Sequence, residues 1–376
     1  MPGAERAVLE ALARALDGSG PPLAPIAPYA PAARAKGAEP AEVPDDVALA
    51  VTTSGSTGDP RTVLVSRAAI EASAAATDRR LGGPAQWLLA LPVHHVAGLQ
   101  VLARSMIAGT DPVILDLQES FTGESFAAAA ERLDGSHRYT SLVPTQLHRV
   151  LASPRGTTAL ADFDAVLVGG AATDPGLLEA ARAAGARIVR TYGMTETAGG
   201  CVYDGVPLDG IQVELDGDGR ILLAGPVLAT GYLDEPALTA RTFVERDGER
   251  WLRTDDLGAL ADGVLRVLGR IDEMISTGGV KVAPVAVEAR LTELAGVAQA
   301  CVVGVPDDEW GTAVVAVLVL SPGAPEPSLE SVRKHVAHSL GTPAAPRRVV
   351  VVAEIPERGP GKPDRRAVQR LAAQSA

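Results

Sequence analysis

The sequence predicts an α/β protein with a large N-terminal layered α/β body, a small antiparallel β subdomain and a small α+β C-terminal domain. Up to residue 191, short apolar runs bounded by turn residues alternate with longer alanine-rich stretches, a pattern typical of α/β layers. Between residues 205 and 269, Asp-Gly pairs separate short apolar runs, as in β-hairpins. After Gly269 a new series of helical and strand patterns begins, which indicates a second domain.

The N-terminal body opens with a predicted amphipathic helix, because apolar side chains recur there at helical spacing. These residues are Val8, Leu9, Leu12 and Leu16. Residues 17–46 are rich in proline, alanine and glycine, so we expect an extended covering segment or a flexible lead-in, with ordered structure from near Asp46 onward. The alternating series then predicts strands at 47–52, 87–92, 112–117, 139–143, 165–168 and 187–191, and helices at 67–81, 98–108, 144–152 and 175–184.

The remaining elements belong to the subdomain and to the C-terminal domain. Strands are predicted in the subdomain at 211–215, 220–224 and 264–268. The C-terminal series comprises a turn at 276–279, helices at 284–294 and 329–340, and strands at 297–303, 313–320 and 348–352. We place a hinge at 270–272, which divides the chain into an N-terminal domain (1–271) and a C-terminal domain (272–376).

The composition excludes several classes of protein. With 376 residues, 47% of them apolar, the chain is long enough for two globular domains. A net charge of -12 repels phosphate backbones, so no nucleic acid is expected as a main partner. Cys201 and Cys301 form neither a disulfide framework nor a zinc motif, as expected for a reduced, cytoplasmic protein. The apolar runs are far shorter than the roughly 20 residues that span a bilayer, so no membrane partner is expected.

A loop rich in hydroxyl groups and glycine follows the first predicted strand. Residues 52–58 read TTSGSTG. Glycines let the backbone turn its amides toward an anion and the hydroxyls add donors, so this composition can bind phosphates. The lysine that a P-loop needs after its second glycine is missing, and a polar turn without a ligand is the alternative interpretation.

A second polar segment, YGMTET at 192–197, is predicted directly after the strand at 187–191. Ligands bind at this carboxyl end of the strands in open α/β sheets. A tyrosine ring can stack on a flat base, a threonine can donate to a phosphate, and a glutamate can hold Mg²⁺ through oxygen. A polar turn with a half-buried tyrosine is the alternative.

Six short segments occur in an order that resembles a known superfamily. They are STGDPRT at 56–62, YGMTE at 192–196, GPVLATGY at 225–232, LRTDD at 252–256, GRID at 269–272 and GK at 361–362. This series is similar to that of the adenylate-forming superfamily, which includes acyl-CoA synthetases, nonribosomal peptide adenylation domains and luciferases. The resemblance extends over about four fifths of the chain.

The chain departs from the superfamily pattern at three positions. Arg61 and Thr62 stand where the superfamily has lysine and glycine, and Asp255 replaces the glycine before the ribose-binding aspartate. Whether Asp255 or Asp256 would meet the ribose is left open. Because the first motif already begins near residue 54, the resemblance also implies a shortened N-terminal subdomain.

Two further segments indicate one group of enzymes within the superfamily. Residues 91–105 and 192–210 are most similar to the o-succinylbenzoate-CoA ligases of menaquinone biosynthesis, in their short actinobacterial form. The resemblance implies an AMP-forming acid–thiol ligase that uses ATP, Mg²⁺ and coenzyme A together with a small-molecule acid. A ligase for another aryl or acyl acid, a stand-alone adenylation domain and a degenerate nucleotide-binding homologue remain alternatives. The oligomeric state is left open, with a homo-oligomer among the alternatives.

The resemblance also implies roles for individual residues. Lys362, one of only four lysines, would be catalytic with Thr195 and Glu196, and Glu196 would also bind Mg²⁺. The nucleotide would be bound by Ser54, Gly55, Ser56, Thr57, Gly58, Gly169, Gly170, Ala171, Tyr192, Gly193, Met194, Asp256 and Arg270.

For the thioester step, the superfamily swings a mobile C-terminal domain about the residue matching Asp272. This motion would replace Lys362 with Gly278 and Gly279, which would line the coenzyme A tunnel. His95 and Arg104 are candidates for binding the acid, with a structural cap and a solvent-facing arginine as the alternatives.

Overall fold

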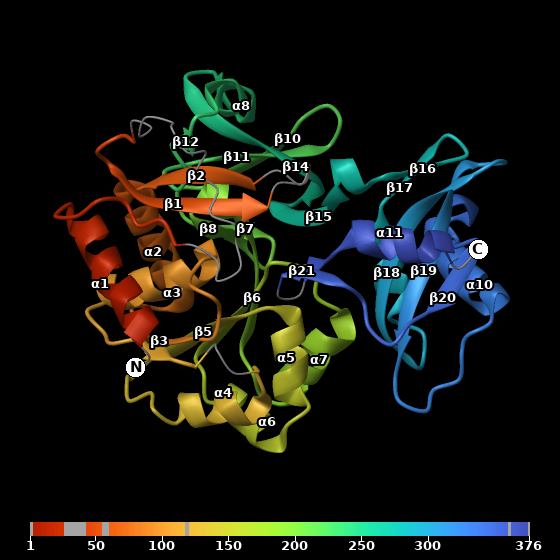
Figure 1. Cartoon of the computed structure of the whole chain (residues 1–376), viewed down its shortest axis with the longest axis horizontal. Coiled ribbons are helices and arrows are strands. Elements are labelled where there is room, and N and C mark those ends of the chain that lie inside the picture. The colour runs from red at the N-terminus through yellow and green to blue at the C-terminus, as the bar shows by residue number, and fades with distance from the viewer. Residues whose placement is uncertain (1–2, 26–42, 55–59, 117–119, 360–361, 375–376) are drawn as a thin grey trace.

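The computed structural model describes residues 3–25, 43–54, 60–116, 120–359 and 362–374. Figure 1 shows a large body that contains the N-terminus and a smaller C-terminal part beside it. Both parts combine helices and sheets, which confirms the predicted α/β class with a small α+β C-terminal domain. Within the described ranges, none of the helices has the length and apolar character needed to cross a bilayer.

The body is organised around a seven-stranded sheet with the order β4-β3-β5-β6-β7-β8-β9. The pairings from β4 to β7 are parallel, and those of β8 and β9 are antiparallel. The strands are β3 (Gln86–Leu89), β4 (Val113–Ile114), β5 (Arg138–Leu142), β6 (Ala165–Val168), β7 (Ile188–Met194), β8 (Gly199–Tyr203) and β9 (Val206–Pro207). The five parallel strands confirm the sequence prediction, with ends that differ by up to three residues.

Helices cover both faces of this sheet, because side chains along each strand alternate between the faces. Trp87 and Leu89 belong to one core with α1–α3, whereas Leu88 belongs to a second core with α4–α7. The helices are α1 (Gly3–Asp17), α2 (Arg67–Leu81), α3 (Val96–Ile107), α4 (Gly123–Ala130), α5 (Pro144–Leu151), α6 (Pro154–Ala161) and α7 (Pro175–Ala183). Figure 1 shows the two helix layers on opposite sides of β3, β5 and β6. Helices α4 and α6 were not predicted.

A second sheet, with the order β1-β2-β12, lies next to α1 and α2. Its strands are β1 (Val47–Ser54), β2 (Pro60–Ser66) and β12 (Gly231–Tyr232). Leu23, in the described part of the predicted covering segment, extends this sheet through a parallel bridge to Leu49. We had predicted a loop that begins at residue 52, but residues 52–54 still belong to β1. Strand β2 was not predicted. Threonine and β-branched residues favour extended backbone, whereas the glycines nearby had indicated only a turn.

The antiparallel subdomain is confirmed as a five-stranded sheet in the order β10-β11-β14-β13, with β15 paired to β14. Its elements are β10 (Gln212–Leu215), β11 (Arg220–Ala224), α8 (Pro236–Thr242), β13 (Phe243–Arg246), β14 (Glu249–Ala261) and β15 (Val264–Arg270). Strands β13 and β14 were not predicted, although an Asp-Gly turn follows each of them. Asp262 and Gly263 have φ angles of 51° and 75°, as the tightest hairpin turns require.

The C-terminal part contains the sheet β18-β19-β20 with a core on each face. Its elements are η2 (Ile271–Glu273), β16 (Ile275–Thr277), β17 (Val280–Val282), α9 (Pro284–Leu291), β18 (Val297–Asp307), β19 (Gly311–Leu320), α10 (Leu329–Leu340), η3 (Thr342–Ala344), β20 (Arg348–Val351), β21 (Glu357–Gly359), β22 (Lys362–Pro363) and α11 (Arg365–Gln374). The described residues of both cores all follow residue 272, while the exact boundary at 271 and 272 stays a prediction.

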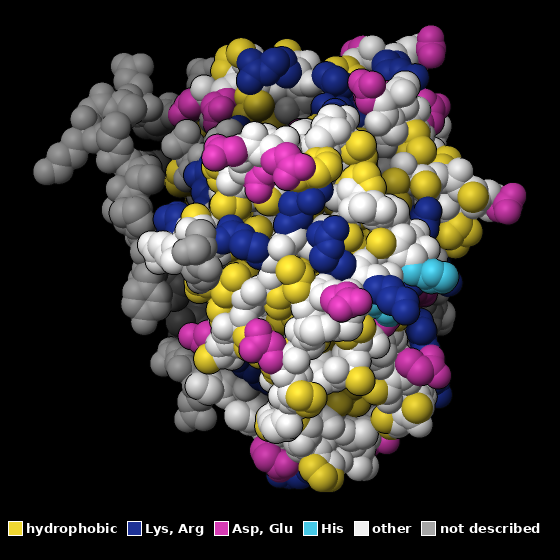
Figure 2. Space-filling view, turned by 90° about the vertical axis from the view of Figure 1, so that its right-hand side faces the viewer, with side chains coloured by type: hydrophobic (Ala, Val, Ile, Leu, Met, Phe, Trp, Pro, Cys, Tyr) yellow, Lys and Arg dark blue, Asp and Glu magenta, His cyan; other side chains and the backbone are white. Residues whose placement is uncertain are grey.

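Figure 2 shows the outer face of the C-terminal part. Basic side chains lie near the middle of this face and at its top and edges, and acidic side chains are interspersed among them. This face therefore carries many basic side chains, although the net charge of the chain is -12.

Candidate active site

Strand β7 changes partner where the predicted nucleotide motif begins. Its N-terminal half pairs with the parallel strand β6, whereas the half that starts at Thr191 pairs with the antiparallel strand β8. Tyr192, Gly193 and Met194 therefore lie within the strand and not after it, which corrects the prediction. The turn η1 (Thr195–Thr197) follows directly and places the glutamate of the motif at the carboxyl end of β7.

Two glycines of the predicted nucleotide site are required by packing. A Cβ at Gly193 would lie 2.1 Å from the backbone oxygen of Gly199, and a Cβ at Gly169 would lie 2.2 Å from Oγ1 of Thr191. Gly170 adopts a φ of 82°, a conformation that favours glycine. The loop after β6 therefore approaches β7 closely, in the region where the adenine is predicted to bind.

Replacing Gly193 by alanine is expected to lower the free energy of unfolding by about 3 kcal/mol. The new Cβ would meet the backbone oxygen of Gly199, which cannot move without disturbing the pairing of β7 and β8. Chemical denaturation would measure the change. Gly217→Ala is the matched control, because a Cβ there meets no atom within 4 Å. Equal stability of the two variants would contradict this account.

Tyr192 and Asp256 connect the seven-stranded sheet to the antiparallel subdomain. The Tyr192 hydroxyl donates a hydrogen bond of 2.8 Å to Oδ2 of Asp256 on β14. Burial raises the pKa of the Asp256 carboxyl and, together with that carboxyl, the pKa of Tyr192. The side chain of Asp256 is 12% exposed, whereas that of Asp255 is 53% exposed. Of the two aspartates that the sequence left open, Asp256 is the one that lies beside Tyr192.

Arg270 lies opposite Asp256 in the pairing of β14 and β15. Its Nη1 is 3.7 Å from Oδ1 of Asp256, and its Nη2 is 3.5 Å from Oδ2 of Asp255. Its Nε donates to Oδ1 of Asp272 at 2.9 Å. The Arg270 guanidinium thus forms ion pairs with three carboxylates. One of them is that of Asp272, the predicted hinge residue, which is therefore bound to the body.

Glu196 is held from the second sheet. The hydroxyl of Tyr232 on β12 donates a hydrogen bond of 2.8 Å to Oε1 of Glu196. The backbone amide of Ala229 donates to the backbone oxygen of Glu196 at 2.9 Å. Burial and the Glu196 carboxylate raise the pKa of Tyr232, so its hydroxyl stays protonated and continues to donate. These contacts bring the η1 turn, with its buried Thr195, next to the β1–β2 hairpin.

The predicted phosphate loop joins β1 to β2. Gly55, Ser56, Thr57 and Gly58 lie outside the described residues, and Ser54 ends β1. Arg61, which replaces the superfamily lysine, lies in β2 opposite Thr53. Leu233, directly after β12, donates its amide to Thr62 O at 2.9 Å. The hairpin is therefore fixed on one side by the same segment that carries Tyr232.

His95 and Arg104 are not brought together by α3. His95 precedes the helix, is exposed and makes no capping bond through its side chain. Arg104 is buried and lies over the ring of Trp87, 5.2 Å from its centroid. Nine positions, about 13 Å along a helix, separate the two residues, and His95 stands before the first turn of α3. Arg104 therefore does not face solvent, and its proposed contact with the acid stays a prediction.

The remaining candidates lie on the C-terminal part. Gly278 and Gly279 form the turn between β16 and β17, with φ angles of 54° and 80°. The Gly278 amide donates to the backbone oxygen of Trp310 at 3.1 Å, and a Cβ at Gly278 would meet the Trp310 ring at 2.7 Å. Lys362 begins β22, and Figure 1 shows the β21 hairpin extending from the C-terminal part toward the body.

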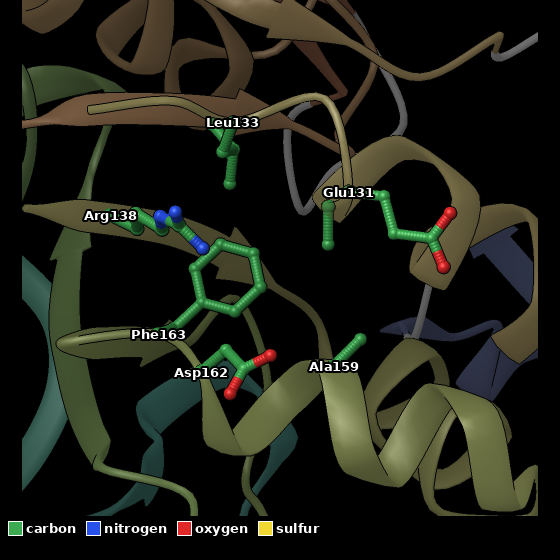
Figure 3. A pocket seen from close by; sticks show the side chains of 7 residues that line it. Glu131, Leu133, Arg138, Ala159, Asp162 and Phe163 are labelled. Atoms are coloured by element: carbon green, nitrogen blue, oxygen red, sulfur yellow. The ribbon is translucent and has the colours of Figure 1, made fainter. Parts of the chain in front are cut away.

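A cavity of about 190 Å³ lies elsewhere in the body, at the N-terminal ends of β5 and β6. Figure 3 shows the ring of Phe163 beside Arg138 on one wall, with the carboxylate of Glu131 on the other side turned away from the ring. Tyr192 and Glu196 lie at the opposite, carboxyl end of the parallel strands, which is the end where open α/β sheets bind ligands. This cavity is therefore separate from the candidate site.

Two family models match the chain. Residues 7–233 match the AMP-binding enzyme family, and residues 286–362 match the C-terminal domain of AMP-binding enzymes. The chain belongs to the AMP-binding enzyme family. This finding confirms the superfamily that the six ordered segments had indicated.

The relatives of this AMP-binding enzyme include a probable 2-succinylbenzoate–CoA ligase of Mycobacterium tuberculosis. That relative is 48% identical over 366 residues, which cover 96% of this chain and 94% of the relative. Among solved structures, the amide bond synthetase McbA from Marinactinospora thermotolerans has a TM-score of 0.76 at 30% identity, covering 88% of this chain and 70% of that one.

A third similar protein is the o-succinylbenzoate CoA synthetase (MenE) from Bacillus subtilis, in complex with the acyl-adenylate intermediate OSB-AMP. Its TM-score is 0.73 at 28% identity, and the match covers 86% of this chain and 69% of that one. The same enzyme is also known in complex with ATP and a magnesium ion.

Sequence reasoning about this AMP-binding enzyme missed two residues. Tyr232 was noted in the GPVLATGY segment, but its contact with Glu196 joins segments 36 positions apart and leaves no local signal. Arg365 follows the GK segment closely and forms ion pairs with Glu273 and Glu288. An arginine three residues after the motif lysine was the available signal, but arginine is the common cation of this chain.

Proposed function

We propose that this chain is an o-succinylbenzoate-CoA ligase of menaquinone biosynthesis. The observation that carries the proposal is one site in which hydrogen bonds join three of the six motifs. Tyr192 of YGMTE donates to Asp256 of LRTDD, and Tyr232 of GPVLATGY donates to Glu196 of YGMTE. The identity of 48% with the mycobacterial ligase supports o-succinylbenzoate as the acid. ATP and coenzyme A are the other two substrates.

The nucleotide is proposed to lie along the carboxyl end of β7. Its adenine would fit between Tyr192 and the small residues Gly169, Gly170 and Ala171. Its ribose hydroxyls would bind Asp256 and Arg270, which face each other across β14 and β15. Its phosphates would meet Thr195 and the hairpin loop at residues 54–58, with backbone from Gly193 and Met194 beside the base.

Adenylation needs positive charge, because two anions must approach each other. A carboxylate oxygen attacks the α-phosphorus of ATP, and the bond to pyrophosphate breaks as the acyl-AMP forms. Lys362 is proposed to donate from its ammonium to both the carboxylate and the α-phosphate. Glu196 suits Mg²⁺, because this cation prefers one or two carboxylate oxygens together with substrate phosphates. Bound there, Mg²⁺ would neutralise charge on the phosphates.

Thioester formation is proposed to use a second arrangement of the same chain. The thiol of coenzyme A gives up its proton to water, its sulfur attacks the acyl carbon, and AMP leaves with the electron pair of the broken C–O bond. We propose that the domain of residues 272–376 rotates about Asp272 for this step, so that Gly278 and Gly279 replace Lys362 at the site. Their tight turn lacks side chains, which suits a narrow tunnel for the pantetheine arm.

The acid is proposed to bind near the N-terminus of α3. His95 stays the candidate for contact with the acid, and its ring lies 4.3 Å from that of His94. Burial lowers the pKa of His94, which favours a neutral imidazole there.

The enzyme is proposed to act in the cytoplasm. Both cysteines are free and buried, which supports a reducing compartment. The oligomeric state, with a homo-oligomer among the alternatives, stays a prediction.

A panel of acids tests the proposal. We expect pyrophosphate release with o-succinylbenzoate to exceed that with benzoate by at least about 100-fold in kcat/KM, because benzoate lacks the second carboxylate. Each acid is assayed with and without coenzyme A, and AMP rather than ADP is expected as the nucleotide product. Equal turnover of the two acids would exclude the proposed substrate, and ADP would exclude the reaction class.

A further inference from the structure

Consecutive acidic residues at the junction of the two parts are bound by arginines from opposite sides. Asp272 accepts from Nε and Nη2 of Arg270 at 2.9 and 3.2 Å. Glu273 accepts from Nε of Arg365 at 2.9 Å. Arg270 ends β15 in the body, whereas Arg365 begins α11 in the C-terminal part. Asp272 is therefore bound to the body and Glu273 to the C-terminal part, so the chain passes from one part to the other between these two residues.

Arg365 is fastened to the C-terminal part by several further bonds. Its Nη2 donates to Oε2 of Glu288 on α9 at 3.0 Å, and its Nη1 donates to the backbone oxygen of Val302 on β18 at 2.9 Å. Glu288 also accepts from the amide of Val302 at 2.7 Å. The side chains of Arg365 and Glu288 are 17% and 15% exposed. A forked guanidinium that binds two carboxylates and a carbonyl in a partly buried place holds one orientation.

The same arginine lies at the end of the hairpin that carries Lys362. Strand β22 begins at Lys362, and the amide of Asp364 donates to the backbone oxygen of Pro356 at 2.7 Å, which closes the hairpin. The Asp364 carboxylate accepts from the amide of Ala367 in the first turn of α11. Arg365 is therefore the side chain that connects the base of this hairpin to the exit of the hinge.

We propose that Arg365 is a positioning residue for adenylation, which ties the Lys362 hairpin to Glu273 so that a rotation between residues 272 and 273 moves the hairpin as part of one rigid unit. This inference rests on the proposed role of Lys362. Arg270 and Arg365 have complementary tasks: the first holds Asp272 to the body, and the second holds Glu273 to the moving part. Without Arg365, the hairpin opens more often and loses its fixed distance from the hinge.

Arg365→Met tests this inference through the two half-reactions. We expect kcat for adenylation to fall about 30-fold, because a displacement of about 1 Å at a reacting group has effects of this size. The KM for ATP should change less than about twofold, since the nucleotide residues belong to the body. Thioester formation from synthetic acyl-AMP should stay within about threefold, and Arg365→Lys should recover part of the loss. Arg290→Met is the matched control, because Arg290 forms an exposed ion pair with Glu293 in the same part.

Hydrogen exchange provides a readout that needs no substrate. Amides of Glu357, Gly359, Lys362 and Asp364 should exchange about tenfold faster in Arg365→Met than in the wild type, while amides of α10 should not change. An unchanged exchange rate in the hairpin would overturn the inference. Equal losses in both half-reactions, with faster exchange throughout the C-terminal part, would also overturn it, because Arg365 would then only stabilise the domain. Failure of the proposed function would appear separately, as wild-type enzyme that does not turn over o-succinylbenzoate.

Discussion

Replacing Lys362 by alanine is expected to reduce acid-dependent adenylation by about 10³-fold or more. The ammonium is proposed to act only when the carboxylate and the α-phosphate come together, so its loss removes stabilisation of the transition state. Pyrophosphate exchange with the acid and ATP measures this step. Thioester formation from synthetic acyl-AMP should remain within about fivefold of the wild type, because Lys362 is proposed to leave the site for that step.

The scarcity of lysine offers a matched control for this experiment. Lys334 lies exposed on α10, and Lys334→Ala is expected to leave both half-reactions within about twofold of the wild type. Adenylation by the Lys362→Ala enzyme within tenfold of the wild type would show that another group supplies the charge.

Replacing Asp256 by asparagine is expected to raise the KM for ATP by roughly 30- to 100-fold. A hydrogen bond to a charged group contributes about 2–3 kcal/mol when the partner is desolvated, and the Asp256 side chain is buried beside Tyr192. The fold should tolerate this change. Burial raises the pKa of Asp256, so a neutral residue of the same shape relieves the cost of desolvating the charge. Thermal unfolding would check this point.

Asp255→Asn removes the neighbouring charge and serves as the matched control. The Asp255 side chain is half exposed and forms ion pairs with Arg220 and Arg270 at 3.3 and 3.5 Å. Exposed pairs contribute up to about 1 kcal/mol, so the KM for ATP should change less than about fivefold. A larger increase in the KM for ATP in Asp255→Asn than in Asp256→Asn would show that Asp255, and not Asp256, binds the ribose.

The parallel core of the fold could be predicted because its signal is local. Strand β6 and helix α10 begin and end where the apolar pattern and the bounding turns indicate. Elements whose stability comes from distant partners escaped prediction. Strand β2 stands between β1 and β12, and β12 is only two residues long and lies far along the chain. Helix α4 has a capping box from Thr122 and Ser125, but its alanines carry little apolar periodicity.

The candidate site could be predicted only as a set of residues. The motifs named Tyr192, Glu196 and Asp256, but no spacing in the sequence shows that a hydroxyl of one motif meets the carboxylate of another. Arg104 shows that a helical pattern does not predict which side of a helix packs on a given strand. Its burial against Trp87 depends on how α3 rests on β3, which the helical pattern alone does not specify.

The β1–β2 hairpin has a consequence for how the enzyme attracts a highly charged nucleotide. In many phosphate sites the loop runs straight into a helix, whose aligned peptide dipoles place a partial positive charge at the anion. Here the strand after the loop continues for seven residues, roughly 20 Å, before α2 begins at Arg67. The macrodipole of that helix points at a place remote from the loop. At the proposed site, attraction for the triphosphate would therefore come from the amides and hydroxyls of the loop, from cationic side chains and from Mg²⁺, and nucleotide affinity would fall as ionic strength rises.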